Sequence, residues 1–190
     1  TSCDDDEGGT VVEDPCANVT CADGEVCAGG VCIDTTTVPS NEVRVTTNIS
    51  ENTTWTSDKC YILGGRITVL DGVTLTIEPG TLIKGEAGNG ANATALLVAR
   101  GGTLMAEGTA DAPIIFTSVA DEITLEQIAD GDFKSPNLDP DQNGFWGGVL
   151  VLGKAPISAS NEDTGEQLSE IQIEGIPTSD ANGLYGGNDD

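Results

Sequence analysis

The chain of 190 residues contains no histidine, and this absence removes a large part of enzyme chemistry. Ser-His and Cys-His nucleophile pairs, imidazole acids and bases, and zinc sites built on histidine all need that side chain. Carboxylate pairs, lysine or arginine bases and oxygen-bound metals remain available. Basic residues are also scarce, with 7 Lys and Arg against 32 Asp and Glu, so the formal net charge is -25.

This charge balance argues against nucleic acid as a partner, because phosphates require a basic surface. The same field disfavours direct adsorption to anionic lipid. No run of eighteen apolar residues is present, so we expect membrane attachment, if there is any, to be through a covalent lipid. An acidic chain suits solubility outside a cell or binding of Ca²⁺, whose ligands are oxygens.

Long amphipathic helical patterns are missing, and the best helix candidate is the short stretch Asp121 to Ile128. Glycine is frequent at 25 residues, and Thr and Val are common, which is a composition typical of β-strands. Residues 67–77 alternate apolar and polar side chains, and we expect one apolar face made of Ile67, Val69, Val73, Leu75 and Ile77.

The apolar segments repeat along the chain. When residues 71–81 are set over residues 100–109, Gly, Thr, Leu and Glu coincide at an offset of 29 residues. Residues 145–158 supply a third unit of short strand and glycine turn. Such repeats, with few helices, predict an all-β fold, a parallel β-helix (solenoid). A β-sandwich is the alternative, because alternation and turns would look similar there.

A cysteine-rich segment precedes this repeat. Four cysteines lie close together with turn signals between them: Cys16, Cys21, Cys27 and Cys32. This density predicts disulfides formed in an oxidising compartment, and zinc bound by four thiolates is the alternative. The segment resembles EGF-like and other short cysteine-rich modules. We therefore expect an acidic tether at 1–13, the disulfide-rich module at 14–34, a linker at 35–42 and the β-helix at 43–190.

From about Cys60 to Gly187 the chain resembles the parallel β-helix surface lipoproteins of the Bacteroidota. Segments that carry the resemblance are GGRITVLDGVTLTIEPGTLIKG, ALLVARGGTLMAEGTADAPIIFTS and GFWGGVLVLGKAPIS. The resemblance implies a right-handed β-helix at the cell surface and implies little about activity. Further coils usually follow in such proteins, so it also implies that this chain is a fragment of a longer β-helix.

The first residues, TSCDDDEGGT, fit the same resemblance. TSC resembles the end of a lipobox, which would make Cys3 the lipidated residue. The acidic run Asp4, Asp5, Asp6 and Glu7 resembles the signal that exports lipoproteins of these bacteria to the outer face of the outer membrane. The alternative is a disulfide between Cys3 and Cys60; if Cys3 is lipidated, Cys60 is an odd thiol buried near the first coil.

Two weaker features are candidate binding sites. Asp139, Asp141 and Asn143 fit the first half of a Ca²⁺ loop, although Leu150 stands where an EF-hand needs its bidentate acid. An ordinary Asp/Asn/Gly turn is the alternative. Trp146 and Phe145 could form a platform that stacks against a ligand such as a sugar ring, or the aromatic residue beside the paired glycines could pack over backbone.

No motif joins an acid to a base or a metal, so we expect a protein that is not an enzyme and requires no cofactor, with Ca²⁺ as the one candidate. A lyase would use a base among Lys84, Arg100 and Lys154, whereas a glycosidase would need two facing acids, drawn from Asp71, Glu78, Glu107 and Asp111. The predicted function is a binding or structural component of a cell-surface assembly, whose partners are other outer-membrane or surface proteins and glycans. A carbohydrate-binding or polysaccharide-degrading β-helix is the alternative.

Overall fold

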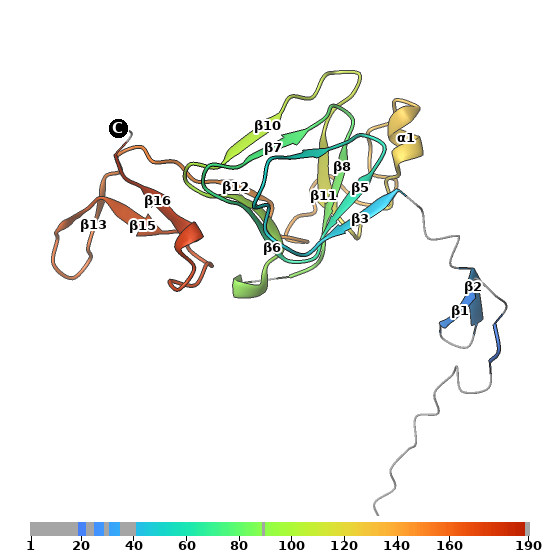
Figure 1. Ribbon diagram of the computed structural model, residues 1–190, viewed down its shortest axis with the longest axis horizontal. Helices are drawn as coiled ribbons and strands as arrows, with labels where there is room; N and C mark the ends of the chain where they lie inside the picture. The colour runs from blue at the N-terminus through green and yellow to red at the C-terminus, as the bar shows by residue number, and fades with distance from the viewer. Residues whose placement is uncertain (1–18, 22–24, 29–30, 35–40, 89, 189–190) are drawn as a thin grey trace, which may run out of the picture. The chain divides into compact units, whose positions relative to one another are not determined.

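The computed structural model (Figure 1) describes residues 19–21, 25–28, 31–34, 41–88 and 90–188. The chain divides into two compact units, Thr1–Ser40 and Asn41–Asp190. In the first unit, β1 (Glu25–Ala28) pairs antiparallel with β2 (Val31–Asp34). In the second unit, the first strand is β3, which begins at Glu42.

Several predicted features of the N-terminal unit lie outside the described residues: Cys3, the acidic run Asp4 to Glu7, and Cys16. Cys21 is disulfide-bonded. The backbone places Cys27 opposite Cys32 in the ladder of β1 and β2. Disulfides among all four cysteines of this module stay a prediction, as do the lipid and the export signal, and the sequence left the pairing open.

The second unit is built on three parallel sheets, which the chain visits in the same order on every turn. Sheet 1 contains β3, β5, β8 and β11 (Glu42–Val45, Cys60–Leu63, Leu82–Gly85 and Ile115–Ser118). Sheet 2 contains β6, β9 and β12 (Arg66–Val69, Ala95–Val98 and Val149–Val151). Sheet 3 contains β4, β7 and β10 (Thr53–Trp55, Thr74–Ile77 and Thr103–Ala106). Because neighbouring strands in these sheets are all parallel, this is a right-handed parallel β-helix and not a sandwich.

The strand register reproduces the sequence repeat at one step between coils, from β6 to β9 and from β7 to β10. Thr103 lies opposite Thr74 in sheet 3, and Ala95 lies opposite Arg66 in sheet 2, both at the predicted offset of 29 residues. In sheet 1 Leu82 lies opposite Cys60, an offset of 22 residues. The repeat length therefore varies with the length of the corners between strands.

The side chains that point into the coils form one continuous core. The five residues predicted to share an apolar face are all buried and belong to this core: Ile67, Val69, Val73, Leu75 and Ile77. Those within strands lie opposite apolar residues of the next coil, as Ile67 does opposite Leu96 and Leu75 does opposite Leu104. In the N-terminal coils, Trp55 of β4 and Tyr61 of β5 stack with their ring centroids 4.7 Å apart.

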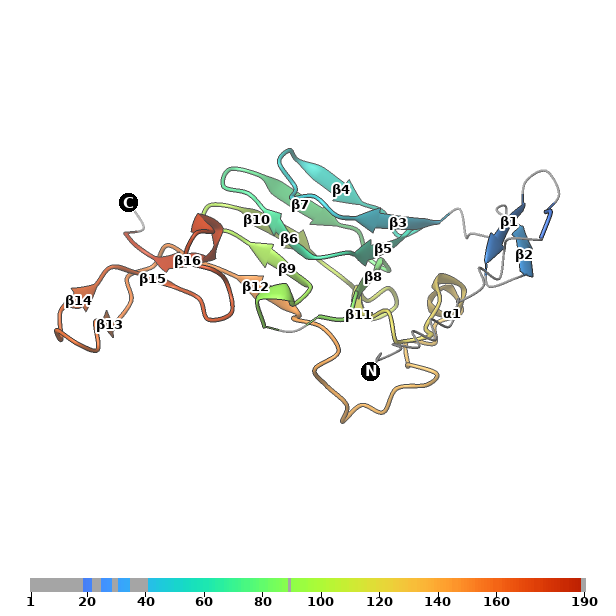
Figure 2. The same cartoon turned by 90° about the horizontal axis from the view of Figure 1, so that it is seen from below.

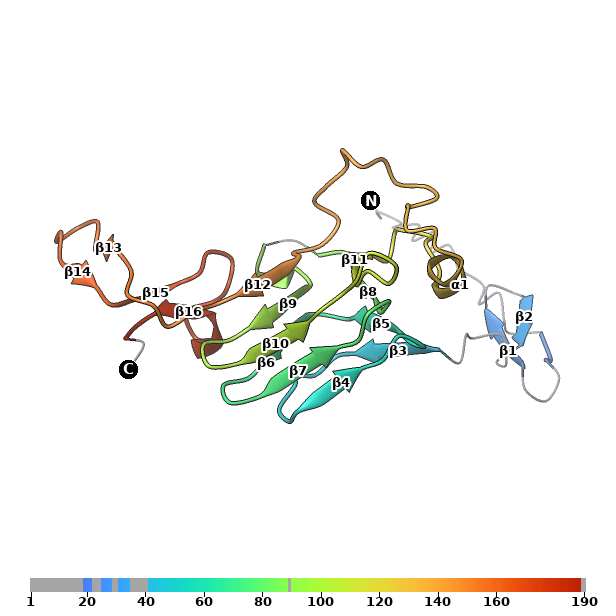
Figure 3. The ribbon, with the colours of Figure 1, turned by 90° about the horizontal axis from the view of Figure 1, so that it is seen from above.

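Sheet 1 is covered on its outer face by the long connection between β11 and β12. This connection carries α1 (Leu125–Ala129), whose Ile128 packs with Ile123 against Cys60 and Leu82. The helix was expected to begin at Asp121, but Asp121 forms a turn and Thr124 caps the helix, accepting a hydrogen bond from the N–H of Gln127. The connection extends beyond α1 as a long loop that leads to β12 (Figures 2 and 3).

Sheet 2 is covered by the residues that follow the last parallel strand. They form two antiparallel hairpins, β13–β14 and β15–β16 (Ala159–Ser160, Gln167–Leu168, Glu170–Gln172 and Leu184–Gly186). In the described residues of this unit, two short 3₁₀ helices are also present, η2 at Gly90–Asn92 and η3 at Ala181–Gly183. Ile176 packs with Leu152 against Leu97 on the outer face of this sheet. The range 43–190 predicted for the β-helix thus contains parallel coils up to Val151 and hairpins after it.

Candidate functional site

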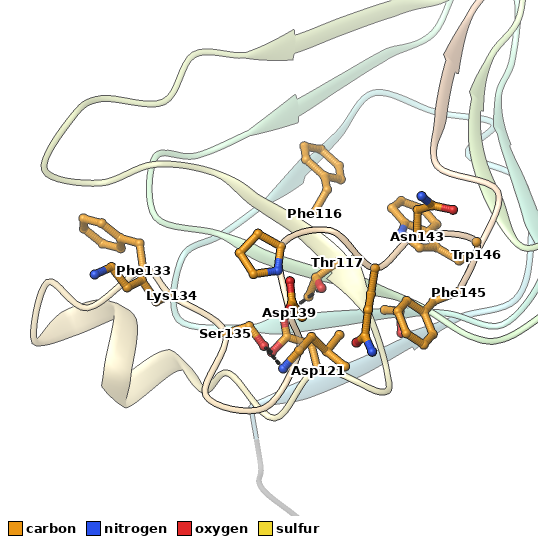
Figure 4. Close-up of a pocket in the computed structure, with 15 residues that line it drawn as sticks. Phe116, Thr117, Asp121, Phe133, Lys134, Ser135, Asp139, Asn143, Phe145 and Trp146 are labelled. Atoms are coloured by element: carbon orange, nitrogen blue, oxygen red, sulfur yellow. Dashed lines mark hydrogen bonds between the residues drawn. The ribbon is translucent and has the colours of Figure 1, made fainter.

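The long connection that covers sheet 1 also forms one side of an open cavity of about 690 Å³, which we call the insertion pocket. One wall is the strand β11 and the turn after it, and the other is residues 133–146 of the connection. Figure 4 shows Phe133 and Lys134 on one side, Phe145 and Trp146 on the other, and Asp121 between them. Asp139 and Asn143, proposed as Ca²⁺ ligands, and Trp146, proposed as a stacking residue, all line this one pocket.

Asp121 holds the pocket wall together through both oxygens of its buried carboxylate. Oδ1 accepts hydrogen bonds from the N–H of Ile123 at 3.0 Å and from the hydroxyl of Ser135 at 2.8 Å. Oδ2 accepts from the hydroxyl of Thr117 at 2.8 Å. The side chain of Asp121 therefore links β11 through Thr117, the start of the connection through Ile123, and the part of the connection after α1 through Ser135.

Lys84 secures the same turn from the neighbouring strand β8. Its ammonium group donates to the backbone carbonyls of Asp121 and Ile123, at 2.6 Å and 2.7 Å. The amide of Asn137 adds two further bonds, accepting from the N–H of Glu122 and donating to the carbonyl of Ala120. These contacts fix the path of the connection where it leaves the coils.

The candidate Ca²⁺ ligands lie in a turn on the rim of the pocket. Oδ1 of Asp139 accepts a hydrogen bond from the N–H of Asp141 at 3.0 Å, and its carbonyl accepts from the N–H of Gln142. This is the geometry of an Asx turn, and Gly144 follows with a φ of 82°. Over the described part of the chain, no three or more Asp, Glu, Cys or His side chains gather where they could hold a metal. The Ca²⁺ site stays a prediction.

Trp146 lies half-buried at the other end of the pocket, and its indole rests over Gly85 of β8. A Cβ at Gly85 would lie 2.6 Å from Cδ2 of Trp146, so this contact requires glycine. Gly147 also approaches backbone closely, since a Cβ there would be 2.9 Å from the carbonyl oxygen of Thr94. The indole thus packs over backbone, as one interpretation expected, and also lines the pocket. Stacking on a ligand stays a prediction.

Phe145, which the sequence paired with Trp146 as a candidate stacking platform, also lines the pocket. The other two aromatic residues of the lining were not found from sequence. Phe116 comes from β11 and Phe133 from the loop after α1, and they share no motif. Phe116 lies opposite Ile83 in the register, which identifies it as an inward-facing residue of the last turn.

The side chains proposed for a lyase or a glycosidase are spread over the β-helix; Glu107 and Asp111 are exposed, and the others contact neighbouring groups. Lys84 donates to the two carbonyls described above. Arg100 donates to Glu170 at 2.6 Å and to the carbonyl of Gly186 at 2.7 Å. Lys154 lies 3.8 Å from Asp71, and Glu78 accepts from the N–H of Ser57.

A smaller cavity of about 290 Å³ lies beside the C-terminal hairpins. Its charged lining is Asp71, Arg100, Lys154 and Glu170, two acids and two bases that form the ion pairs just described. Opposite charges are paired here, so the cavity offers no excess charge of either sign to a ligand.

Cys60 is a free thiol, buried between sheet 1 and the connection that covers it. The alternative disulfide between Cys3 and Cys60 is therefore not present, and the odd buried thiol near the first coil is the arrangement found. Burial raises the pKa of Cys60 from its ordinary value of 9.0 to about 11, against an opposing effect of Lys84. The described residues include no helix long and apolar enough to cross a membrane.

A family model described as a pectate-lyase-like β-helix domain matches residues 47–130. The match begins in the first turn of the β-helix and ends just after α1, so it includes most of the stacked strands. It stops before residues 133–146, which form the outer wall of the insertion pocket. No curated protein and no solved structure matches the chain significantly. The chain is thus similar to pectate-lyase-like domains in its coils, and that similarity assigns nothing to the pocket.

Proposed function

We propose that this protein is a non-catalytic binding component of a bacterial cell surface, with the β-helix as its rigid scaffold. The proposal rests on the observation that the candidate catalytic bases interact with other groups of the protein. Lys84, Arg100 and Lys154 contact backbone carbonyls or acids that join the coils to the segments around them. A general base needs a free lone pair within reach of a substrate proton, and Lys84 and Arg100, hydrogen-bonded in this way, do not supply one.

The location proposed for it is the outer face of the outer membrane, with a lipid on Cys3 as the anchor. The acidic run after Cys3 and the resemblance to Bacteroidota surface lipoproteins support this location. The cysteine-rich segment would then be a small EGF-like, disulfide-stabilised module between the anchor and the β-helix. Partners would be other surface proteins or glycans, reached without direct contact between the acidic chain and the lipid.

A carbohydrate-active enzyme is the second candidate, and the match to a pectate-lyase-like domain favours it. The two are separated by incubating the protein with oligogalacturonate and Ca²⁺, and with neutral polysaccharides. New reducing ends and unsaturated uronate products are then measured. We expect no product above a heat-denatured control. Product formation that is lost in Arg100→Gln or Lys154→Gln would contradict the non-catalytic proposal.

The anchor is tested by intact mass spectrometry of the native protein extracted from membranes, before and after reduction. We expect a chain that starts at Cys3, carries acyl groups and gains the mass of two reduced disulfides. An unacylated chain that retains Thr1 and Ser2 would contradict the lipoprotein proposal. The binding role of the β-helix would not depend on that result.

A further inference from the structure

The insertion pocket has the size and lining of a ligand site. Its volume of about 690 Å³ lies within the roughly 300–1,000 Å³ that is usual for small-molecule pockets. Aromatic side chains form much of the wall, with polar groups between them. Because Asp121 and Lys84 fix residues 117–135 of the wall by hydrogen bonds, a ligand need not order that part of the cavity.

The aromatic groups suit a ligand with C–H faces. Trp146 is supported from behind by Gly85, so its indole cannot retreat into the core when something presses on it. The π face of an aromatic ring carries partial negative charge, and the C–H bonds on one face of a sugar ring carry partial positive charge. A pyranose ring can therefore lie against a supported indole with favourable dispersion and electrostatics.

Two amides are among the polar groups of the pocket that are left for a ligand. In the described part of the chain, the side chains of Gln142 and Asn143 have no hydrogen-bond partner, although both line the cavity. Each amide offers a donor and an acceptor on adjacent atoms, which matches a pair of neighbouring hydroxyl groups. The buried carboxylate of Asp121, in contrast, already uses both oxygens on protein donors.

Charge selects against acidic sugars. The ionisable residues that line the pocket are Asp121, Asp139 and Lys134, two carboxylates against one ammonium group. They belong to a chain with a formal net charge of -25. A uronate would bring a carboxylate into a site that already carries excess negative charge, and like charges brought together oppose binding.

From these features we propose that the insertion pocket binds a neutral saccharide segment, with one ring on Trp146 and hydroxyl groups on Gln142 and Asn143. The inference rests on the proposed binding function and names its ligand class. It also separates this site from the acidic polymer named in the matched domain description, because the outer wall lies beyond the matched residues.

The test uses tryptophan emission, because the chain has only two tryptophans. Trp55 is 3 % exposed and stacked on Tyr61, so Trp55→Phe leaves Trp146 as the single reporter. This variant of the full chain is titrated with neutral hexasaccharides of glucose, mannose, xylose and galactose, and with oligogalacturonate. At least one neutral ligand should change the emission saturably, with a dissociation constant of roughly 0.1–1 mM, and oligogalacturonate should not.

The decisive comparison is between the parent and a variant that lacks the side-chain amides of Gln142 and Asn143. Gln142→Ala combined with Asn143→Ala changes exposed residues, so the fold should be retained while binding weakens about tenfold or more. The matched control is Glu162→Ala with Asp163→Ala, two exposed residues near the β13–β14 hairpin, which should bind as the parent does.

Three results would overturn the inference. These are a lack of saturable change with every neutral sugar, an equal response to oligogalacturonate, or binding that is unaffected by loss of the amides. The same mixtures are assayed for cleavage products. If products form and binding depends on the amides, the non-catalytic function is rejected and saccharide binding in the insertion pocket is retained. If neither binding nor products are detected, saccharide binding is rejected and the non-catalytic function is retained.

Discussion

Replacement of Asp121 by alanine should loosen the whole connection that covers sheet 1. Three donors lose their acceptor: the hydroxyls of Thr117 and Ser135 and the N–H of Ile123. Thr117 and Ser135 are partly exposed, so their hydroxyls can turn to water. Ile123 is 1 % exposed, so its N–H is left without a partner.

The size of the effect follows from that difference. A buried donor without an acceptor costs about 1–3 kcal/mol, and a hydrogen bond to a charged group contributes about 1.5–3 kcal/mol. Because the hydroxyls recover water and the removed charge no longer has to be desolvated, we expect a total of about 2–4 kcal/mol for Asp121→Ala. For a unit of this length, that corresponds to a fall in melting temperature of roughly 5–15 °C.

The assay is thermal unfolding followed by circular dichroism, with hydrogen exchange to locate the change in residues 119–138. Asp121→Asn keeps an acceptor for Ile123 and Ser135, and its NH₂ group can donate to the hydroxyl of Thr117, so it should lose only about 1 kcal/mol. Asp163→Ala, at an exposed site, should stay within about 0.5 kcal/mol of the parent. An Asp121→Ala variant with the same melting temperature as the parent would refute the assigned role of this carboxylate.

Two further predictions concern Gly85 and Cys60. Gly85→Ala should displace the indole of Trp146, lower stability by about 1–3 kcal/mol and shift the emission of that tryptophan, whereas Gly65→Ala, whose Cβ meets nothing within 4 Å, should do neither. An unchanged emission spectrum in Gly85→Ala would show that the indole does not rest there. The Cys60 thiol, with a pKa of about 11, should not react with a disulfide reagent at pH 8 until the protein is unfolded in guanidinium, and rapid labelling of the native protein would contradict its burial.

The β-helix could be predicted because its evidence is local and repeated. Alternation in residues 67–77 identified the inward face, and the 29-residue offset identified strands that lie in register. The offset holds only for the step from β6 to β9 and from β7 to β10, and it fails for the pairs β5–β8, β4–β7 and β9–β12, because the corners between strands differ in length and loop lengths are weakly constrained by stacking. The helix was placed four residues too early because Asp121 was interpreted as a helical residue and is instead an acceptor for a turn.

The pocket could be predicted only in pieces. Trp146, Asp139 and Asn143 were each noticed through local chemistry, as an aromatic residue beside glycines or as oxygen ligands in a turn. Their assembly depends on how a connection of about thirty residues crosses sheet 1, and that path is set by tertiary contacts between residues far apart in the chain. The alternation of apolar and polar residues along the sequence does not reveal such contacts, so Phe116 could not be assigned to the same site.

Two adjacent residues of β8 control both ends of that connection, and the alternation of a strand explains how. Lys84 points outward and holds the beginning of the connection through the carbonyls of Asp121 and Ile123. Gly85 points inward and leaves the space into which Trp146 packs at the other end. Because successive side chains of a strand face opposite sides, one short strand positions the entry and the exit of the pocket wall independently of the residues between them. Those intervening residues are free of the stacking that constrains the coils, which is why specificity for a ligand can be built there without disturbing the β-helix.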